Sequence, residues 1–373
     1  MESIDAWLVL HHTPSVGAVT YRKLLAQFES PQQLLQSSLS TLRSSGLLRA
    51  PALEFIAKGE AHWEASIEKD LRWLEEPHSH LLTFDDERYP PLLKEISDPP
   101  PLLYVKGEVD RLSFPQVAMV GSRNPDTQGR ETARDFARRL ARAGVTITSG
   151  MALGVDTESH QGALEEGGTV AVVGTGLDRV YPAKNRALAH QIVEGGAMIS
   201  EFPVGTEPHP SNFPKRNRII SGLSLGTLVV QAAKKSGSLI TARLAMEQGR
   251  EVFAIPGSIH NPLARGNHQL IRQGAKLVET TEDVMEELGG MLDLLQEKLF
   301  EGEVEAVLTD EVVVEEGSPA DHLLQKMGFE PILIDQLVTL SGLTTEVVSS
   351  MIMRLEIQGQ VVSLPGGRVQ RHH

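Results

Sequence analysis

The sequence predicts an α/β protein whose main domain is a doubly wound, mostly parallel sheet with helices on both faces. From residue 117 onward, short apolar runs alternate with helical stretches, which is typical of parallel strands joined by crossover helices. Helical apolar spacing precedes this region, and two helices with a hairpin follow it. We expect a small helical SAM-like domain at 1–80, the α/β domain at 81–290, an acidic linker at 291–330 and a winged-helix-like domain at 331–373.

The first 75 residues show apolar side chains at helical spacing, interrupted by turns. The turn at 14–17, which opens onto Tyr21, resembles a helix-hairpin-helix, where backbone amides at a helix start can meet a phosphate. A tight turn between packed helices explains the same residues without any DNA contact.

The α/β domain is expected to contain six strands, with a possible seventh at one edge. The strands are predicted at 117–120, 145–148, 169–173, 198–201, 227–231, 251–255 and 276–278. The crossover helices are predicted at 132–143, 157–165, 185–194, 217–223, 239–248 and 268–272.

The C-terminal segment is predicted to form helices at 334–341 and 345–358 and then a hairpin of strands 360–364 and 368–371. The Gly-Gly turn between the strands suits the wing of a winged helix. Its bases are few, so protein contact or plain packing explains this domain as well as duplex recognition does.

Charge is distributed unevenly along the 373 residues, whose formal net charge is −14. Residues 115–290 carry 19 bases and 18 acids, whereas residues 291–330 carry 2 bases and 11 acids. We interpret the acidic stretch as a solvated, self-repelling spacer. A DNA-mimicking tail that competes for a basic groove is the alternative.

The composition excludes several classes of site. The chain has no cysteine, which rules out disulfides, thiol catalysis and cysteine-bound zinc, and its 13 histidines show no metal-ligand spacing. We therefore expect neither a metal nor another cofactor. No apolar run of membrane length, signal peptide or lipidation motif occurs, which predicts a cytoplasmic protein without membrane contact.

The turn after the first parallel strand has the residues of a phosphate-binding loop. Gly121 and Ser122 offer amide and hydroxyl donors, and Arg123 adds a planar fork that can grip a phosphodiester. The Walker pattern GxxxxGK[ST] is missing, so a triphosphate with magnesium is not expected. The glycine-containing turn at 174–179 lacks the third glycine of a dinucleotide fingerprint and is interpreted as a simple turn.

A later helix start repeats this chemistry. Ser236, Gly237 and Ser238 open the helix that bears Arg243, and free N–H groups at a helix start attract anions. Helix capping explains either serine equally well.

The segment 212–218 is the strongest local signal for an anionic ligand. It combines three cations and an amide with an aromatic ring that can stack on an unpaired base, namely Lys215, Arg216, Arg218, Asn217 and Phe213. The alternative places Phe213 in the core and pairs the cations with acids such as Glu201. Lys184 and Asn185 also lie near the carboxyl end of a predicted strand, where ligands of open α/β sheets collect.

Several motifs together resemble the DNA-processing protein A family, DprA or Smf. They are VGSR, SGMALGVD with His160, YPAKN, SEFPVG, NFPKRNRIISGLS, SGSLITAR and PGSIHNPLARGNHQLIRQGAKLV. The resemblance implies an extended Rossmann domain that binds single-stranded DNA, forms a homodimer and helps to load the RecA recombinase during natural transformation.

The resemblance also implies where these contacts lie. The family's basic DNA pocket corresponds here to Ser122, Arg123 and residues 215–218. Its self-association surface corresponds to residues 267–276, with Asn267, Leu270 and Ile271 as the expected contacts.

Two other functions are weaker. A nucleotide-cleaving enzyme of the related lysine-decarboxylase-like Rossmann group would need the motif PGGxGTxxE, whereas residues 235–241 contain no glutamate. A winged-helix transcription factor would need a basic recognition helix, but the predicted helix 345–358 holds Arg354 against Glu346 and Glu356. We therefore expect a non-enzymatic single-strand binder.

Overall fold

The computed structural model describes residues 3–290 and part of the chain beyond them. In the remainder it describes Leu324, Lys326, Met327, Val348, Met351, Ile352 and Leu355, together with residues 332–341, 361–364 and 368–371. The chain folds as two compact units, 1–295 and 296–373.

The first unit begins with six helices. They are α1 (Ser3–His12), α2 (Ala18–Phe28), α3 (Pro31–Gln36), α4 (Leu39–Ser44), α5 (Ala50–Ala57) and α6 (Glu60–Leu74). Ser30 and Ser38 cap α3 and α4, because each side chain accepts a hydrogen bond from a backbone N–H three residues later. The apolar residues of these helices share one core, in which Leu8, Leu24 and Leu42 are fully buried.

A nine-stranded sheet forms the centre of this unit, in the order β1-β2-β6-β5-β4-β3-β7-β8-β9. The strands are β1 (Ser79–Thr83), β2 (Leu102–Gly107), β3 (Gln116–Val120), β4 (Thr146–Ser149), β5 (Thr169–Val172), β6 (Ala197–Ser200), β7 (Gly226–Val229), β8 (Glu251–Ala254) and β9 (Lys276–Leu277). Strands β3 to β9 run parallel and confirm the seven predicted strands to within two residues. Strands β1 and β2, which are antiparallel and extend the sheet beyond β6, were not predicted.

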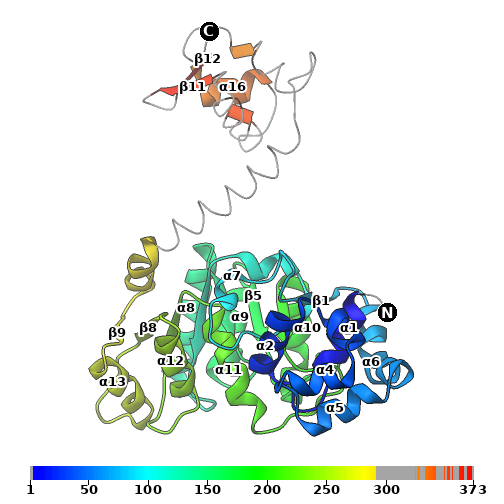
Figure 1. Cartoon of the computed structure of the whole chain (residues 1–373). Helices are drawn as coiled ribbons and strands as arrows, with labels where there is room; N and C mark the ends of the chain where they lie inside the picture. The colour runs from blue at the N-terminus through cyan, green and yellow to red at the C-terminus, as the bar shows by residue number, and fades with distance from the viewer. Residues whose placement is uncertain are drawn as a thin grey trace. The chain divides into compact units, whose positions relative to one another are not determined.

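Helices connect the strands and cover both faces of the sheet (Figure 1). They are α7 (Pro91–Lys94), α8 (Thr127–Arg142), α9 (Val155–Leu164), α10 (Arg186–Gly195), α11 (Asn212–Gly222), α12 (Ser238–Glu247) and α13 (Arg265–Arg272), with short 3₁₀ turns η1 (Val109–Ser113), η2 (Ala183–Asn185) and η3 (Pro262–Ala264). Helix α11 begins five residues before its predicted start. Pro214 lies in its first turn, where a missing N–H leaves no hydrogen bond unmade.

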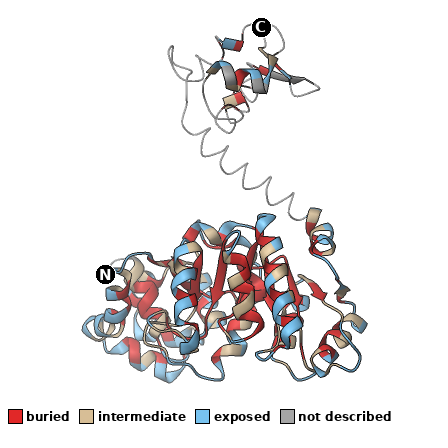
Figure 2. Ribbon diagram, turned by 180° about the vertical axis from the view of Figure 1, so that it is seen from behind, coloured by how far each residue is buried: buried red, intermediate tan, exposed pale blue. Residues whose placement is uncertain are grey.

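Alternation along β3 shows how the two faces are filled. Val117 and Met119 pack in the core with α8 and α9, whereas Ala118 and Val120 pack in the core with α11, α12 and α13. All four side chains are buried, as expected for a parallel strand covered on both sides. Figure 2 shows these central strands as a continuous buried layer.

The strand order reverses between β3 and β7, so the chain leaves these neighbouring strands toward opposite faces. In open α/β sheets, ligands bind at such a point, outside the carboxyl ends of the strands.

The N-terminal helices and the sheet share apolar packing. Leu81 of β1 and Leu102 and Tyr104 of β2 belong to the same core as the six helices. The unpredicted antiparallel strands therefore join the helical segment to the α/β sheet, and the boundary at residue 80 stays a prediction. Among the described residues, no helix is both long and apolar enough to cross a lipid bilayer.

The second unit contains a three-stranded antiparallel sheet in the order β10-β12-β11, formed by β10 (Ile332–Leu333), β11 (Val361–Leu364) and β12 (Arg368–Arg371). Helix α16 (Ile334–Ser341) has its predicted bounds. Leu337, Val361 and Val369 are buried in a small core. The hairpin turn, most of the predicted helix 345–358 and most of the acidic linker lie outside the described residues.

Candidate functional site

A cleft of about 710 Å³ lies at the carboxyl ends of β3 and β7, where the strand order reverses. Loops that follow β3, β4, β5, β6 and β7 and the first turns of α11 and α12 form its walls. Among the predicted site residues, the cleft brings together Gly121, Ser122, Arg123, Phe213, Arg216, Asn217, Ser236, Gly237 and Ser238.

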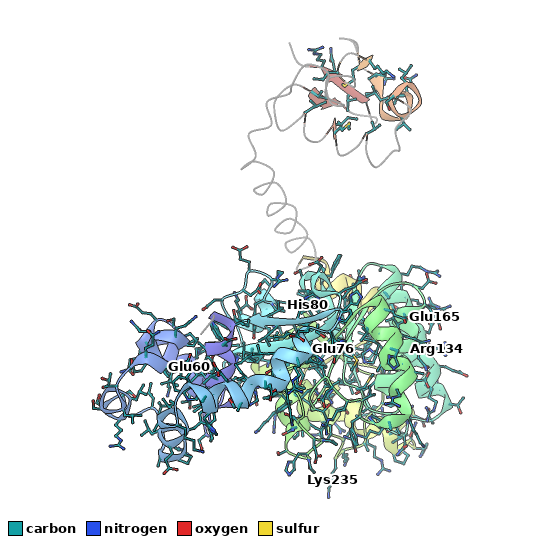
Figure 3. All side chains as sticks on the ribbon, turned by 90° about the vertical axis from the view of Figure 1, so that its right-hand side faces the viewer. Glu60, Glu76, His80, Arg134, Glu165 and Lys235 are labelled. Atoms are coloured by element: carbon teal, nitrogen blue, oxygen red, sulfur yellow. The ribbon has the colours of Figure 1, made fainter. Side chains whose placement is uncertain are left out.

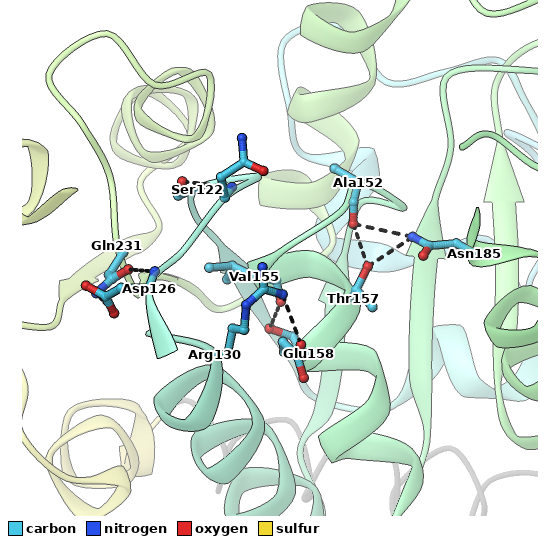
Figure 4. Close-up of polar contacts among 11 residues, drawn as sticks. Ser122, Asp126, Arg130, Ala152, Val155, Thr157, Glu158, Asn185 and Gln231 are labelled. Carbon is cyan, nitrogen blue, oxygen red and sulfur yellow. Dashed lines mark hydrogen bonds and ion pairs between the residues drawn. The ribbon is translucent and has the colours of Figure 1, made fainter. Parts of the chain in front are cut away.

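Hydrogen bonds hold the loop after β3 against the loop after β7. The Ser122 N–H donates to the Gln231 carbonyl at 2.7 Å, and the Gln231 amide donates to the Asp126 carboxylate at 2.8 Å. Asp126 also caps α8 by accepting from the Gly129 N–H at 2.8 Å. Figure 4 shows Gln231 beside Asp126 and the Ser122 loop above them. These hydrogen bonds hold the loop 121–126, whose residues suit a phosphate, in a fixed position.

An arginine and two aromatic rings form the rim of the cleft. The guanidinium carbon of Arg123 lies 5.9 Å from the ring centre of Phe213, and the Phe213 and Tyr181 rings are 5.8 Å apart with a tilt of 32°. Arg123 is exposed and forms no salt bridge within residues 3–290, and Tyr181 is 47% exposed. A cation next to accessible rings can bind a phosphate and stack an unpaired base at the same time.

Sequence reasoning missed Tyr181 as a site residue. Tyr181 could have been recognised because it is an aromatic residue in the loop that follows a predicted strand. The other loops of the cleft also follow strands of the sheet.

The floor of the cleft contains a buried pair of opposite charges. Arg216 is 6% exposed and donates from Nη1 to the Val172 carbonyl, while Asp156 is 8% exposed and accepts from the Ala152 N–H at 3.2 Å. Burial lowers the pKa of Arg216 to about 10 and raises the pKa of Asp156, and each charge opposes the shift of the other. Arg216 was predicted as an exposed phosphate contact, but the structure places it as a buried support of the site.

Gly150 leaves room for this pair. A Cβ at residue 150 would lie 2.3 Å from Nη1 of Arg216 and 2.6 Å from Oδ2 of Asp156, so any larger residue would displace one of them. On the far side, His160 is fully buried and contacts the Gly150 carbonyl at 2.6 Å through Nε2. Burial lowers the pKa of His160 to about 4, so the ring is neutral at pH 7 and its Nε2 carries the hydrogen.

Arg218 is the clearest correction among the predicted site residues. It is 8% exposed, its Nη2 donates to Glu201, and its Nε lies 3.0 Å from Asp98. The alternative interpretation of this cation, pairing with Glu201, is therefore confirmed. Arg218 does not line the cleft.

The other cations predicted for the site are placed differently from one another. Lys184 and Lys215 are exposed, and neither lines the cleft. Arg243 is exposed on α12 and pairs with Glu247 at 3.7 Å, one helical turn later. Asn185 is buried, and its amide donates to the Met151 carbonyl and to the Thr157 hydroxyl, both at 3.0 Å. Figure 4 shows the contact with Thr157. Asn185 is therefore a structural residue.

The start of α12 forms the opposite wall of the cleft. The Ser236 and Ser238 hydroxyls lie 2.6 Å apart, and Ser236 also accepts from the Ser238 N–H at 3.3 Å. Lys235 lines the cleft beside them and projects outward at the lower edge of the unit in Figure 3. Lys235 was not predicted, although it directly precedes the serine pair in the sequence.

The largest group of arginines lies elsewhere and is neutralised by acids. On α8, Arg130 and Arg134 pair with Glu158 and Glu165 at 3.4 and 2.7 Å. Figure 3 shows Arg134 beside Glu165, well away from Lys235. These ion pairs join α8 to the α9 region, so this helix is not a free basic surface.

Two of the predicted dimer contacts are buried within the single chain. Asn267 is fully buried, and its amide donates to the carbonyls of Val229, Val230 and Ile255 at 2.8 to 3.0 Å. Leu270 is 4% exposed in the core beneath α13. Neither side chain is free to contact a second copy, which corrects the prediction. Ile271 is partly buried against the same core.

Within the described residues, no group of three histidine or carboxylate side chains is arranged to hold a metal ion. The chemistry that the cleft offers is therefore cationic and aromatic. Its carboxylate, Asp156, is buried, accepts from the Ala152 N–H and is influenced by the nearby charge of Arg216.

Comparison with protein families finds two matches along the chain. The model of DNA recombination-mediator protein A matches residues 80–289, and the model of the DprA winged helix domain matches residues 313–367.

Individual relatives agree with these matches. The protein Smf of Escherichia coli is 42% identical over 331 residues, which cover 88% of this chain and 86% of that protein. The crystal structure of DNA processing protein A from Streptococcus pneumoniae has a TM-score of 0.68 at 37% identity, covering 77% of this chain and 99% of that one. A structure of DNA processing protein A from Helicobacter pylori, described for its single-stranded DNA binding mode, has a TM-score of 0.52 at 30% identity and covers 57% of this chain and 96% of that one.

Proposed function

Because the chain belongs to the DNA recombination-mediator protein A family, we propose that it binds single-stranded DNA in the cleft between β3 and β7 and acts as a recombination mediator. The solved relative from Helicobacter pylori is described as binding single-stranded DNA, and the cleft offers chemistry for the same ligand.

The arrangement of Arg123, Phe213 and Tyr181 carries this proposal. A ring stacks only on a base whose face is free, so two adjoining rings at the rim favour unpaired over paired bases. Backbone amides, serine hydroxyls and cations surround the rings and suit phosphates. Phosphate contacts carry no sequence information, so we expect affinity without marked sequence preference.

The binding experiment compares single-stranded DNA, duplex DNA and free nucleotides at one salt concentration. We expect the single strand to bind most tightly, and Phe213→Ala to weaken it by roughly tenfold, within the range for loss of one stacked base. Phe114→Ala is the matched control, because Phe114 is 46% exposed and lies under Arg111 at 5.1 Å but does not line the cleft. Equal affinity for duplex DNA would argue against the proposal.

A salt titration tests two of the exposed cations, Arg123 and Lys215. Arg123→Ala and Lys215→Ala should each flatten the slope of log affinity against log salt by about 0.7, the value for one single-strand phosphate. Arg134→Ala, which removes an exposed arginine already paired with Glu165, should leave the slope unchanged. If Arg123→Ala and Lys215→Ala left the slope unchanged, as Arg134→Ala should, the DNA would not pass Arg123 and Lys215.

We also propose that binding, not catalysis, is the activity of this cleft. The alternative, a nucleotide-cleaving enzyme, needs a free carboxylate next to the sugar, whereas Asp156 is buried beside Arg216. Incubation with nucleoside monophosphates and chromatography for released base distinguishes the two. If the wild type released free base and Asp156→Asn did not, the result would support the enzyme.

Dimerisation and delivery of DNA to RecA in the cytoplasm complete the proposal. Because Asn267 and Leu270 are buried, we assign the dimer contact to the neighbouring surface, where Ile271 is partly buried and Leu277 of the edge strand β9 is 45% exposed. Leu277→Glu should shift the sedimentation of a dimer to that of a folded monomer. Capture of purified RecA by the immobilised protein on single-stranded DNA tests the second partner.

A further inference from the structure

Two polar residues of the helical segment, His11 and Asp70, contact the loop that connects β6 to α11, and a third, His12, contacts Asp70. The Nε2 atom of His11 contacts the Glu201 carbonyl at 3.0 Å. The Asp70 carboxylate accepts from the Val204 N–H at 3.0 Å and contacts Nε2 of His12 at 2.8 Å. We call His11, His12 and Asp70 the His–Asp cluster. It ties α1 and α6 to the backbone of residues 201–204.

Burial makes these contacts specific. Asp70 is fully buried, and a buried carboxylate is tolerated only where hydrogen bonds replace its water. Burial also lowers the pKa of His11 to about 4, so its ring is neutral at pH 7. Because a carbonyl oxygen can only accept, Nε2 of His11 must carry the hydrogen and donate it to Glu201.

The same loop reaches the cleft through Glu201. While its carbonyl accepts from His11, its carboxylate accepts from Arg218 on α11, the helix that also carries Phe213 and Arg216. Further along the loop, the Gly205 N–H donates to the Asp178 carboxylate at 2.8 Å. The loop thus lies between the helical segment and the helix that supplies one wall of the cleft.

We propose that Asp70, together with His12, is a positioning residue for the DNA site. By fixing residues 201–204 it sets the position of α11, and hence of Phe213, although neither Asp70 nor His12 lines the cleft. The helical segment then tunes single-strand affinity without touching DNA. This inference rests on the proposed function for its DNA readout alone.

The test compares three variants of the full chain. Asp70→Ala removes the acceptor of the Val204 N–H and should weaken single-strand binding about tenfold, a usual size for coupling between separate sites. Asp70→Asn keeps an oxygen for the Val204 N–H and an amide that can hydrogen-bond to the His12 ring, so it should restore most of the affinity. Leu42→Ala truncates a fully buried side chain of α4 in the same core but removes no hydrogen bond to residues 201–204, and should bind as the wild type does.

Hydrogen exchange gives a readout that does not depend on DNA. Asp70→Ala should speed deuterium uptake in residues 201–213, whereas Leu42→Ala should not. If Asp70→Ala fails to fold, His12→Ala is the substitute, because it removes the second partner of Asp70 and the His12 side chain is 20% exposed. It should also weaken single-strand binding and speed deuterium uptake in residues 201–213, but by less.

The outcomes separate this inference from the proposed function. A wild-type protein that does not bind single-stranded DNA would refute the function, while the exchange measurement would still decide whether Asp70 orders the loop. Wild-type binding combined with equal affinity for Asp70→Ala, or with equal losses for Asp70→Ala and Leu42→Ala, would overturn the positioning role.

Discussion

Replacing Arg216 with alanine should destabilise the fold, and any loss of DNA binding should follow from that. Arg216 is 6% exposed, donates to the Val172 carbonyl and lies beside the buried Asp156. Its removal leaves the carboxylate without its opposite charge and the carbonyl without this donor. The variant therefore tests whether Arg216 supports the cleft or simply holds a phosphate at its surface.

The expected size follows from the two losses. Removing one partner of a buried ion pair in direct contact costs about 3–5 kcal/mol, which is an upper bound here because Arg216 and Asp156 influence each other without a direct salt bridge. Asp156 can escape part of this by binding a proton, because burial already raises its pKa. We therefore expect the lower end of that range, about 3 kcal/mol, together with about 1 kcal/mol for the unsatisfied carbonyl.

Urea unfolding at pH 7.5 of the wild type, Arg216→Ala, Asp156→Ala and the double variant measures this coupling. The double variant should lose less stability than the sum of the single losses, by about 2 kcal/mol, because it leaves no unpaired charge. In Arg216→Ala, the raised pKa of Asp156 makes the folded state bind more protons than the unfolded state. The deficit should therefore shrink as the pH falls from 7.5 to 5.5.

A different result would refute the assignment. Suppose that Arg216→Ala unfolded at the same urea concentration as the wild type, and that its slope of log affinity against log salt were flatter by about 0.7. Arg216 would then be a phosphate contact that the DNA can reach. Lys215→Ala is the natural comparison, since Lys215 is the adjacent cation and is exposed. It should change the slope and leave the stability intact.

Three further predictions concern other parts of the chain. Leu270→Arg places a charge in the core beneath α13, where Leu270 is 4% exposed, and circular dichroism should show an unfolded protein; a folded monomer would restore Leu270 as an interface residue. Burial lowers the pKa of His160 from its ordinary value of 6.5 to about 4 in the folded state. Between these two values the unfolded state binds one more proton than the folded state, so the protein becomes less stable as the pH falls below 6.5. The wild type should lose about 2 kcal/mol more than His160→Gln between pH 7.5 and 5, and parallel urea curves would contradict this. Removal of residues 331–373 should leave the first unit folded with its melting temperature and single-strand affinity unchanged, and loss of either would show that the two units depend on each other.

The parallel strands could be predicted because their sequences are short, almost wholly apolar runs set between helical stretches. Once β3 and β7 were located, the position of the cleft followed, since loops after parallel strands meet at one edge of the sheet. The loop 121–123 and the residues 236–238 were found in this way.

Strands β1 and β2 could not be recognised by the same rule. Residues 79–83 are separated by four residues from the end of a helix and contain only two apolar side chains, and residues 102–107 follow three prolines, so neither shows the strand–helix alternation of the parallel strands. A run of four to six apolar residues fits a strand or part of a buried helix equally well. Pairing with β6, which is far away in sequence, decides between them.

Leu270 was predicted as a surface residue but is buried within the single chain, and only the tertiary packing shows this. Helix α13 is short and mostly polar, so a pair of apolar residues on it suggests a contact surface. In the structure, Leu270 fills the core below β7 and β8, while Asn267 satisfies three carbonyls there. Nothing in the local sequence distinguishes this packing from contact with a second chain.

The cations of α11 show why a cluster in sequence is not a cluster in space. In an α-helix each residue is rotated by about 100° from the one before, so neighbours at 215, 216 and 218 face three different directions. Lys215 is exposed, Arg216 points inward to the carboxyl ends of the strands, and Arg218 turns toward Glu201. The predicted helix starts at residue 217, which leaves 212–216 as a loop whose cations can all reach one ligand. Because the helix in fact begins at Asn212, its geometry assigns one cation to solvent, one to the floor of the cleft and one to the loop that contacts the helical segment.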